Sequence, residues 1–139
     1  MKTEQLIAKL RESGAKVTPQ RLAICEIMLS SKDHPTADQI FEKVKKMHPT
    51  ISLATVYQTL HLLSQIGMLQ ELGFSGCISR YDPDISFHIN VVCPKCGRIQ
   101  DYKTESMERI WTQIIKELEF KLIGQRVEVY VYCDKCSRT

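Results

Sequence analysis

Two Cys-x-x-Cys pairs constrain this chain more than any other feature of its sequence. The pairs are Cys93–Cys96 and Cys133–Cys136. The two-residue spacer lets both sulfurs of a pair turn toward one ion, and four thiolates are the ligand set of a closed, tetrahedral zinc site. Because the loop between the pairs is longer than in a short zinc ribbon, a unit of secondary structure must lie within it. The sequence therefore predicts one structural Zn²⁺ per chain. The alternative is ordinary thiols or redox disulfides.

Two further cysteines stand alone. Cys25 falls on the apolar face of a helical pattern, so we expect a buried small hydrophobic residue. Cys77 lies near a predicted turn and is a candidate reactive thiol. We read no signal peptide and no apolar run long enough to cross a bilayer. This predicts a cytoplasmic protein with no membrane partner, in a reducing compartment where clustered cysteines bind metal.

Positive charge is concentrated in the first part of the chain. Residues 1–80 carry ten Lys or Arg and seven Asp or Glu, whereas residues 81–139 carry nine of each. The net charge of +3 therefore falls entirely in the first part, which is compatible with nucleic-acid binding. The turn-rich segment 82–84 then divides the chain into two predicted domains, residues 1–81 and residues 82–139.

Four helices and a hairpin are predicted within residues 1–81. N-cap residues mark the helix starts, at Thr3, Thr18, Thr36 and Ser52. The third helix should bury Ile40, Phe41, Val44 and Met47. Extended segments at 68–72 and 78–81, joined by turn-forming residues 73–76, follow the fourth helix. The tight connection between the third and fourth helices indicates a helix-turn-helix, and the hairpin after it indicates the wing of a winged helix.

The outward face of the fourth helix carries most of the predicted DNA contacts. Tyr57 and Gln58 are expected near base edges in the major groove. The alternative interpretation is a plain solvated helix face. The full predicted contact set is Ser52, Ala54, Thr55, Tyr57, Gln58 and, from the wing, Arg80.

Residues 82–139 are predicted to form a small unit that needs a metal ion to stabilise it. Strands are expected over 89–92 and 98–102, an amphipathic helix over 105–118, and an alternating strand from Val127 toward Cys133. So small a domain buries little apolar surface. Zinc would join the start of the unit to its end, and a partner subunit would add further burial.

Together these features resemble the ferric-uptake-regulator (Fur) family of metal-dependent repressors. The segments that carry the resemblance are residues 17–21 (Val-Thr-Pro-Gln-Arg), 34–37 (His-Pro-Thr-Ala), 51–57 (Ile-Ser-Leu-Ala-Thr-Val-Tyr) and 80–82 (Arg-Tyr-Asp), with the cysteine pairs and Gly97. The resemblance implies an α/β (α+β) fold with an N-terminal winged helix-turn-helix and a C-terminal α/β dimerisation domain. It also implies a homodimer on a palindromic double-stranded DNA operator, and no enzyme. Gln58 departs from the arginine usual in the family.

The resemblance further implies a regulatory metal site where the two domains meet. The candidate ligands, carried over by motif, are His34, Asp82, His88, Asn90 and Asp101. An ion held from both sides of a hinge fixes the orientation of the two sides, and so the spacing of the recognition helices in a dimer. Two imidazoles, two carboxylates and an amide oxygen suit Fe²⁺ or Mn²⁺ better than a tetrahedral zinc site. Asn90 departs from the family's histidine and is a weaker donor.

Aspartate at positions 82 and 101 resembles the peroxide-sensing (PerR-like) branch. Many iron-uptake regulators have an extra metal site that needs histidine and acid where this chain has Phe87 and Ile89, and a histidine near Gln125. We therefore expect that site to be absent. The leading interpretation is a metal-dependent repressor that senses peroxide through iron-catalysed oxidation of a ligand histidine, His34 or His88. The alternatives are a plain iron- or manganese-responsive repressor of metal uptake and, from another class, a zinc-ribbon thiol oxidoreductase, which a closed four-cysteine site disfavours.

Overall fold

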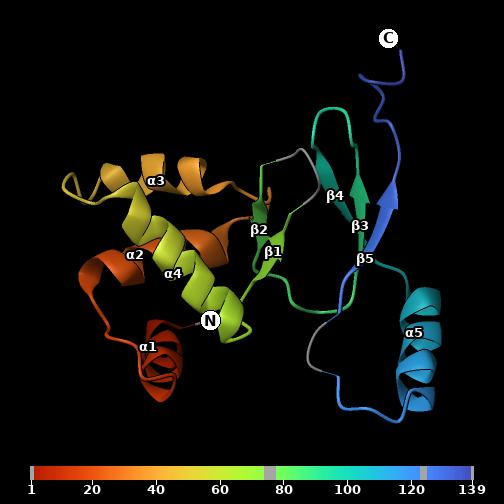
Figure 1. The fold of residues 1–139 in the computed structure, drawn as a ribbon, viewed down its shortest axis with the longest axis horizontal. Helices are drawn as coiled ribbons and strands as arrows, with labels where there is room; N and C mark the ends of the chain where they lie inside the picture. Colours follow the sequence, from red (N-terminus) through yellow and green to blue (C-terminus); the bar gives the residue numbers. More distant parts are fainter. Residues whose placement is uncertain (1, 74–77, 123–124, 139) are drawn as a thin grey trace. The chain divides into compact units, whose positions relative to one another are not determined.

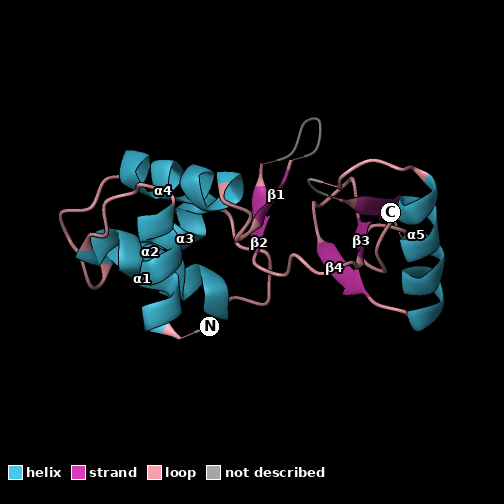
Figure 2. Cartoon of the chain, turned by 90° about the horizontal axis from the view of Figure 1, so that it is seen from below, coloured by secondary structure: helices cyan, strands magenta, loops and turns pink. Residues whose placement is uncertain are grey.

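The structure is a computed structural model that describes residues 2–73, 78–122 and 125–138. Within these residues the chain divides into two units, Met1–Ile85 and Ser86–Thr139. The first unit contains α1 (Thr3–Glu12), α2 (Pro19–Ser30), α3 (Ala37–Lys45), α4 (Leu53–Gln65), β1 (Gln70–Leu72) and β2 (Arg80–Asp82). The second contains β3 (Ile89–Val92), β4 (Ile99–Tyr102), α5 (Glu105–Glu117) and β5 (Val127–Tyr130) (Figures 1 and 2). None of the helices in the described ranges combines the length and apolar character needed to span a membrane.

Side-chain caps set the starts of three helices, as predicted. The hydroxyl oxygen of Thr18 accepts the Arg21 N–H (3.2 Å), and that of Ser52 accepts the Thr55 N–H (3.1 Å). Thr36 forms a reciprocal capping box, because Gln39 Oε1 in turn accepts the Thr36 N–H at 2.9 Å. Each cap satisfies an amide that has no partner within its own helix.

The start of α1 differs from the prediction. Thr3 is the first helical residue and not the cap; Lys2 occupies the N-cap position. The side chain of Gln5 reaches back to accept the Lys2 N–H at 3.2 Å. Gln5 therefore satisfies the N–H of the N-cap residue itself, whereas the predicted threonine cap would have accepted an N–H from the first turn.

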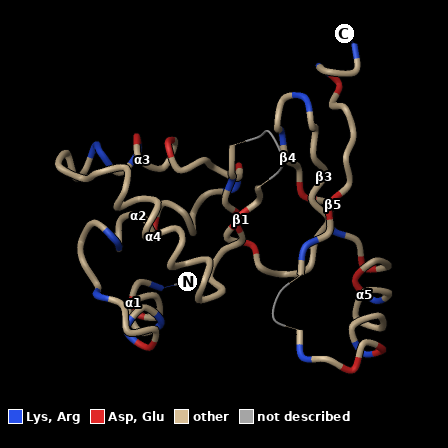
Figure 3. Tube along the Cα trace, viewed as in Figure 1, with Lys and Arg blue, Asp and Glu red and all other residues tan. Residues whose placement is uncertain are grey.

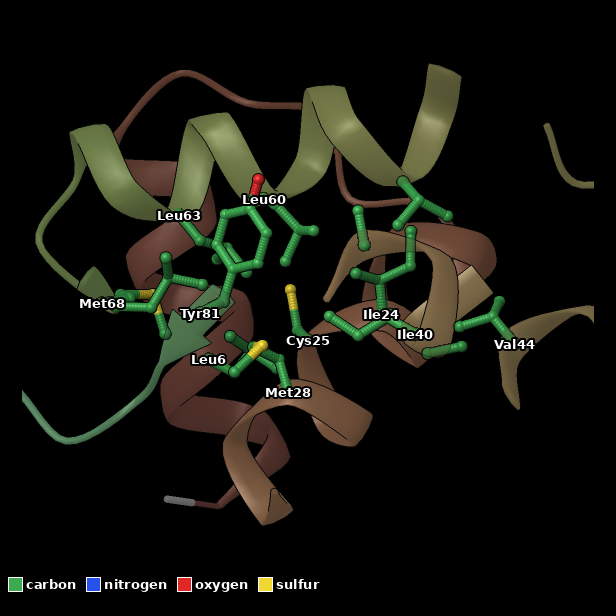
Figure 4. Close-up of a cluster of buried hydrophobic side chains, with 14 of the residues drawn as sticks. Leu6, Ile24, Cys25, Met28, Ile40, Val44, Leu60, Leu63, Met68 and Tyr81 are labelled. Carbon is green, nitrogen blue, oxygen red and sulfur yellow. The ribbon is translucent and has the colours of Figure 1, made fainter. Parts of the chain in front are cut away.

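One apolar core unites the four helices of the first unit. It includes Leu6 and Leu10 of α1, Ile24, Cys25 and Met28 of α2, Ile40 and Val44 of α3, Val56, Leu60 and Leu63 of α4, and Tyr81 of β2 (Figure 4). Met47, which we predicted to be inward-facing, is instead 59% exposed. The reason is that α3 ends at Lys45, so the helical period no longer applies at position 47.

The hairpin is shorter than predicted and begins later. β1 and β2 pair antiparallel, with Glu71 opposite Tyr81. The predicted turn, residues 73–76, extends into positions outside the described residues. α3 and α4 with this hairpin form a winged helix-turn-helix. Asp82, which the sequence placed in a hinge, is the last residue of β2 and is 3% exposed.

The second unit is built on a three-stranded sheet of order β4-β3-β5 (Figure 1). β3 pairs antiparallel with β4 and parallel with β5, so α5 serves as the crossover that parallel pairing requires. The chain is thus of mixed α/β (α+β) class. α5 has no buried residue among those described: Ile110 is 54%, Ile114 39% and Leu118 51% exposed. An amphipathic helix whose apolar stripe stays exposed indicates a surface that a partner covers.

Candidate metal centres and recognition helix

Cys93 and Cys96 lie in a tight turn directly after β3. The Gly97 N–H donates to the Cys93 carbonyl at 2.8 Å, and the Cys93 N–H donates to the Arg98 carbonyl at 2.9 Å. Gly97 has a φ of +75°, a left-handed conformation that glycine adopts without the penalty of a Cβ. Both cysteines therefore lie in one tight turn that begins where β3 ends.

Cys133 and Cys136 form a second turn of the same kind, after β5. The N–H groups of Cys136 and Ser137 both donate to the Cys133 carbonyl, at 2.9 and 2.8 Å. Parallel pairing of β5 with β3 brings this turn beside the first, because Val131 still donates to the Val92 carbonyl at 2.9 Å. The cysteines of both turns therefore meet at one end of the sheet.

The four sulfurs all lie within 4.8 Å of one another. Cys96 Sγ and Cys133 Sγ are 3.8 Å apart, the separation that Zn–S bonds of about 2.3 Å give in a tetrahedron. This is the donor arrangement of a closed structural site, with no place left for a substrate.

The electrostatics of the four-cysteine cluster also favour a bound cation. N–H groups of Cys133 and Cys96 lower the pKa of Cys93, which favours the thiolate form of this sulfur. Burial, together with the neighbouring sulfurs, raises the pKa of Cys136 to about 12. The charge of one thiolate thus disfavours ionisation of another thiol in the same cluster. A divalent cation reverses that effect and permits all four to ionise.

In the first unit, His34 and Asp82 form a buried pair. His34 Nε2 lies 3.4 Å from Asp82 Oδ2, and the two residues are 5% and 3% exposed. The second carboxylate oxygen of Asp82 accepts the Asp84 N–H at 2.9 Å, which fixes the carboxylate plane. An imidazole nitrogen and a carboxylate oxygen held this way are two of the donors that Fe²⁺ and Mn²⁺ accept.

The backbone at His34 is strained and is held by β2. Its φ is +50°, which is uncommon for a residue with a Cβ. Arg80 Nη1 donates to the His34 carbonyl at 3.1 Å, and the Tyr81 N–H donates to the Pro35 carbonyl at 3.0 Å. Arg80, which the sequence suggested for DNA contact, also supports the His34 turn. Sequence alone gives no signal of this bond, because its partners are 46 residues apart.

In the second unit, His88, Asn90 and Asp101 belong to one face of the sheet. Asp101 lies opposite Asn90 in the register, and His88 precedes Asn90 by two residues. His88 Nδ1 contacts the Ser86 carbonyl at 2.8 Å. A carbonyl only accepts, so Nδ1 donates this hydrogen bond and Nε2 is the ring nitrogen that faces Asp101. Nε2 is 3.5 Å from Asp101 Oδ1, close enough for both atoms to bind one metal ion.

Asn90 is buried as a metal ligand would be, although its amide oxygen is a weaker donor than an imidazole nitrogen. The residue is 1% exposed, and no described residue donates a hydrogen bond to its Oδ1. Buried polar atoms almost always have a partner, so an orphaned oxygen on this face needs an explanation. A coordinated cation would satisfy it.

Aromatic and amide side chains occupy the positions that an additional metal site would need. Phe87 stacks on Trp111 of α5 with ring centroids 5.4 Å apart and planes at 15°. Trp111 Nε1 donates to Gln125 Oε1 at 2.5 Å. The stack and the hydrogen bond tie α5 to the segments that precede β3 and β5.

α4 presents the predicted DNA-contacting side chains on its exposed face. Ala54, Tyr57 and Gln58 are exposed, whereas Val56 and Leu60 are fully buried. Ser52 and Thr55 lie at the N-terminus of the helix, where their hydroxyls are 2.9 Å apart.

Cys25 is a structural thiol. It is fully buried, and burial raises its pKa to about 12. Since the thiolate is the reactive form, we expect Cys25 to resist iodoacetamide in the native protein and to react only on unfolding, as peptide mass spectrometry will show. Rapid labelling of Cys25 in the folded protein would contradict its place in the core. Cys77, the other lone cysteine, lies outside the described residues.

Known proteins of similar sequence and structure identify the family of this chain. The model of the Ferric uptake regulator family matches residues 12–130. The peroxide-responsive repressor PerR of Staphylococcus epidermidis is 35% identical over 134 residues, covering 96% of this chain and 89% of the relative. The Campylobacter jejuni peroxide stress regulator superposes with a TM-score of 0.72 at 32% identity, over 98% of this chain and 100% of the other. A manganese-containing ferric uptake regulator from Pseudomonas aeruginosa gives 0.78 at 25% identity, over 91% and 96%. The chain therefore belongs to the ferric uptake regulator family of metal-responsive, DNA-binding regulators.

Proposed function

We propose that this chain is a homodimeric repressor of the cytoplasm that releases a palindromic DNA operator when peroxide oxidises a ligand histidine. The observation that carries the proposal is an imidazole–carboxylate pair in each unit: His34 with Asp82, which are both buried, and the buried His88 with the exposed Asp101. The likeness to peroxide-responsive relatives supports the same conclusion. Zn²⁺ at the four cysteines would have a structural role only.

The regulatory ion would be Fe²⁺ or Mn²⁺, bound by ligands from both units. Each unit alone supplies too few donors for the six-coordinate sites such ions prefer. A shared ion would make the orientation of the two units depend on metal, and operator affinity with it. The proposed ligands are His34, Asp82, His88, Asn90 and Asp101.

The proposed sensing step converts one ligand histidine into a poorer ligand. Bound Fe²⁺ would supply the electrons that cleave the O–O bond of peroxide. In the net reaction, one peroxide oxygen replaces the hydrogen on an imidazole carbon as a hydroxyl group, and the other oxygen leaves as water. The oxidised ring of His34 or His88 binds metal less well, the two units lose their fixed orientation, and DNA is released.

Asn90 supports the second candidate, a repressor that responds to iron or manganese alone. An amide oxygen donates less electron density than the imidazole it replaces. Weaker binding of Fe²⁺ would leave less iron in place to react with peroxide. The two candidates share DNA binding and differ only in whether a histidine is oxidised.

The shared part is tested by selecting duplexes from a random library with Mn²⁺-loaded protein and with chelator-treated protein. We expect a palindromic sequence to be enriched only with metal, through α4 and the proposed contacts Ser52, Ala54, Thr55, Tyr57, Gln58 and Arg80. Affinity should fall steeply with salt because phosphate contacts release counterions. Equal enrichment of all duplexes would contradict a repressor function.

The proposed dimer surface includes the exposed apolar stripe of α5. Ile114→Glu places a charge within that stripe, so we expect a dimer-to-monomer shift at micromolar concentration in sedimentation velocity. Thr112→Glu is the matched control, because Thr112 lies on the polar side of the same helix with Glu105, Glu108 and Arg109. A dimer that tolerates Ile114→Glu as well as the control would place the interface elsewhere.

A further inference from the structure

The proposed recognition helix carries no formal charge. The 13 residues of α4 contain no Lys, Arg, Asp or Glu, so its trace is tan throughout in Figure 3. Its exposed residues are Ala54, Tyr57, Gln58, His61 and Gln65. Such a face binds phosphates weakly, but amide, hydroxyl and methyl groups are well suited to reading base edges.

Positive charge lies instead at the end of the preceding helix. Lys43 and Lys45 are in the last turn of α3, and Lys46 is its C-cap. All three are exposed. In a helix-turn-helix the first helix crosses the backbone while the second enters the major groove. This division assigns phosphate attraction to α3 and leaves base discrimination to the neutral face of α4.

Gln58 is the residue on α4 best suited to forming two hydrogen bonds with a single base. Its buried neighbours Thr59 and Leu60 fix the rotation of the helix, and Thr59 Oγ1 donates to the Thr55 carbonyl at 2.8 Å. Within the part of the chain that the structure describes, the Gln58 amide makes no hydrogen bond. It offers one acceptor and one donor side by side, which adenine matches with its N6 amino group and N7.

Guanine does not match the same amide. Its major-groove edge shows two acceptors, N7 and O6, so the amide oxygen would face an acceptor. Ala54 lies one turn before Gln58 on the same face, and its methyl group is suited to the C5-methyl of thymine. Gln65 is a poorer candidate because it lies at the C-terminal end of α4, whereas residues near the N-terminus reach the bases.

We propose that Gln58 selects adenine at one major-groove position in each half-site, with Ala54 against the methyl group of a nearby thymine. This inference rests on the proposed function, since it requires that α4 enter the groove. It makes Gln58 a specificity-determining residue. The operator of this protein should differ at that base pair from operators read by an arginine, which pairs with guanine.

The test uses full-length, Mn²⁺-loaded protein and the palindrome enriched from a random duplex library. Gln58→Arg should change the preferred base from adenine to guanine at one position per half-site and leave the other positions unchanged. A good bidentate contact discriminates by about 5- to 150-fold, so binding to singly substituted duplexes will resolve the change. Gln65→Arg is the matched control and should change no preference.

Base analogues test the contact itself. Replacing the selected adenine with 7-deazaadenine removes the N7 acceptor and should weaken wild-type binding several-fold, while having no effect on Gln58→Ala. Uracil in place of the nearby thymine should weaken wild type more than Ala54→Gly. If Gln58→Ala weakens all duplexes equally, the residue contacts phosphate and the inference is wrong. If no duplex is enriched at all, the proposed function fails instead.

Discussion

Replacing Cys133 with serine should cause the chain to lose its zinc, and the second unit should then unfold. The unit has few other sources of stability: α5 has no buried residue among those described, and the strands have only four residues each. Structural zinc binds with apparent free energies of about 10–16 kcal/mol in small zinc-stabilised peptides. Loss of the zinc ion therefore removes more free energy than a core this small supplies.

The measurement is zinc content by elemental mass spectrometry together with thermal unfolding. Wild type should hold one zinc per chain, and Cys133→Ser close to none, with an early transition from the second unit and loss of the dimer. Cys25→Ala is the control, since it removes a thiol from the first unit and should keep zinc. Full zinc content and an unchanged dimer in Cys133→Ser would exclude the four-cysteine site. Easily oxidised, zinc-free cysteines in wild type would revive the oxidoreductase interpretation.

Local signals in the sequence predicted the regular elements well. The strand before Cys93 was expected over 89–92, which matches β3, and the helix expected over 105–118 matches α5 to within one residue. Both elements could be predicted because their apolar residues follow a clear pattern, and the strand also leads directly into Cys93. Caps at Thr18, Thr36 and Ser52 are equally local, since each bond spans three residues.

The candidate regulatory site shows what such local reasoning misses. The residues were found by resemblance, but their surroundings depend on contacts distant in sequence. Arg80 donates a hydrogen bond to the carbonyl of His34. No sequence pattern predicts the left-handed φ of His34. The orientation of His88 comes from the Ser86 carbonyl, a group that every residue type has. The position of Asp82 was predicted wrongly, because Asp-Pro-Asp is typical of a turn, whereas pairing with Gln70 places Asp82 in a strand.

Brief exposure of Fe²⁺-loaded protein to low peroxide should add a single oxygen to a peptide that contains His34 or His88 and should abolish operator binding. The same dose on Mn²⁺-loaded protein should do neither, because Mn²⁺ drives this chemistry far less well. His88→Ala should lose the response to both metals. Asn90→His should increase metal affinity, since imidazole replaces a weaker donor. Peptide mass spectrometry and an operator-binding assay on the same samples give both readouts.

The other two of the chain's four histidines make this test decisive. His61 is exposed and His48 is half-buried, whereas His34 and His88 are only 5% and 4% exposed. Oxidation by peroxide or radicals in bulk water follows accessibility, so it would modify His61 and the exposed thioether of Met47 first. Oxidation generated at a bound iron follows proximity and would modify the buried histidines first. If His34 and His88 stay intact on iron-loaded protein that has left DNA, or if His61 and Met47 are oxidised before them, the peroxide mechanism is wrong. The plain metal-responsive repressor, to which Asn90 already points, then becomes the better account.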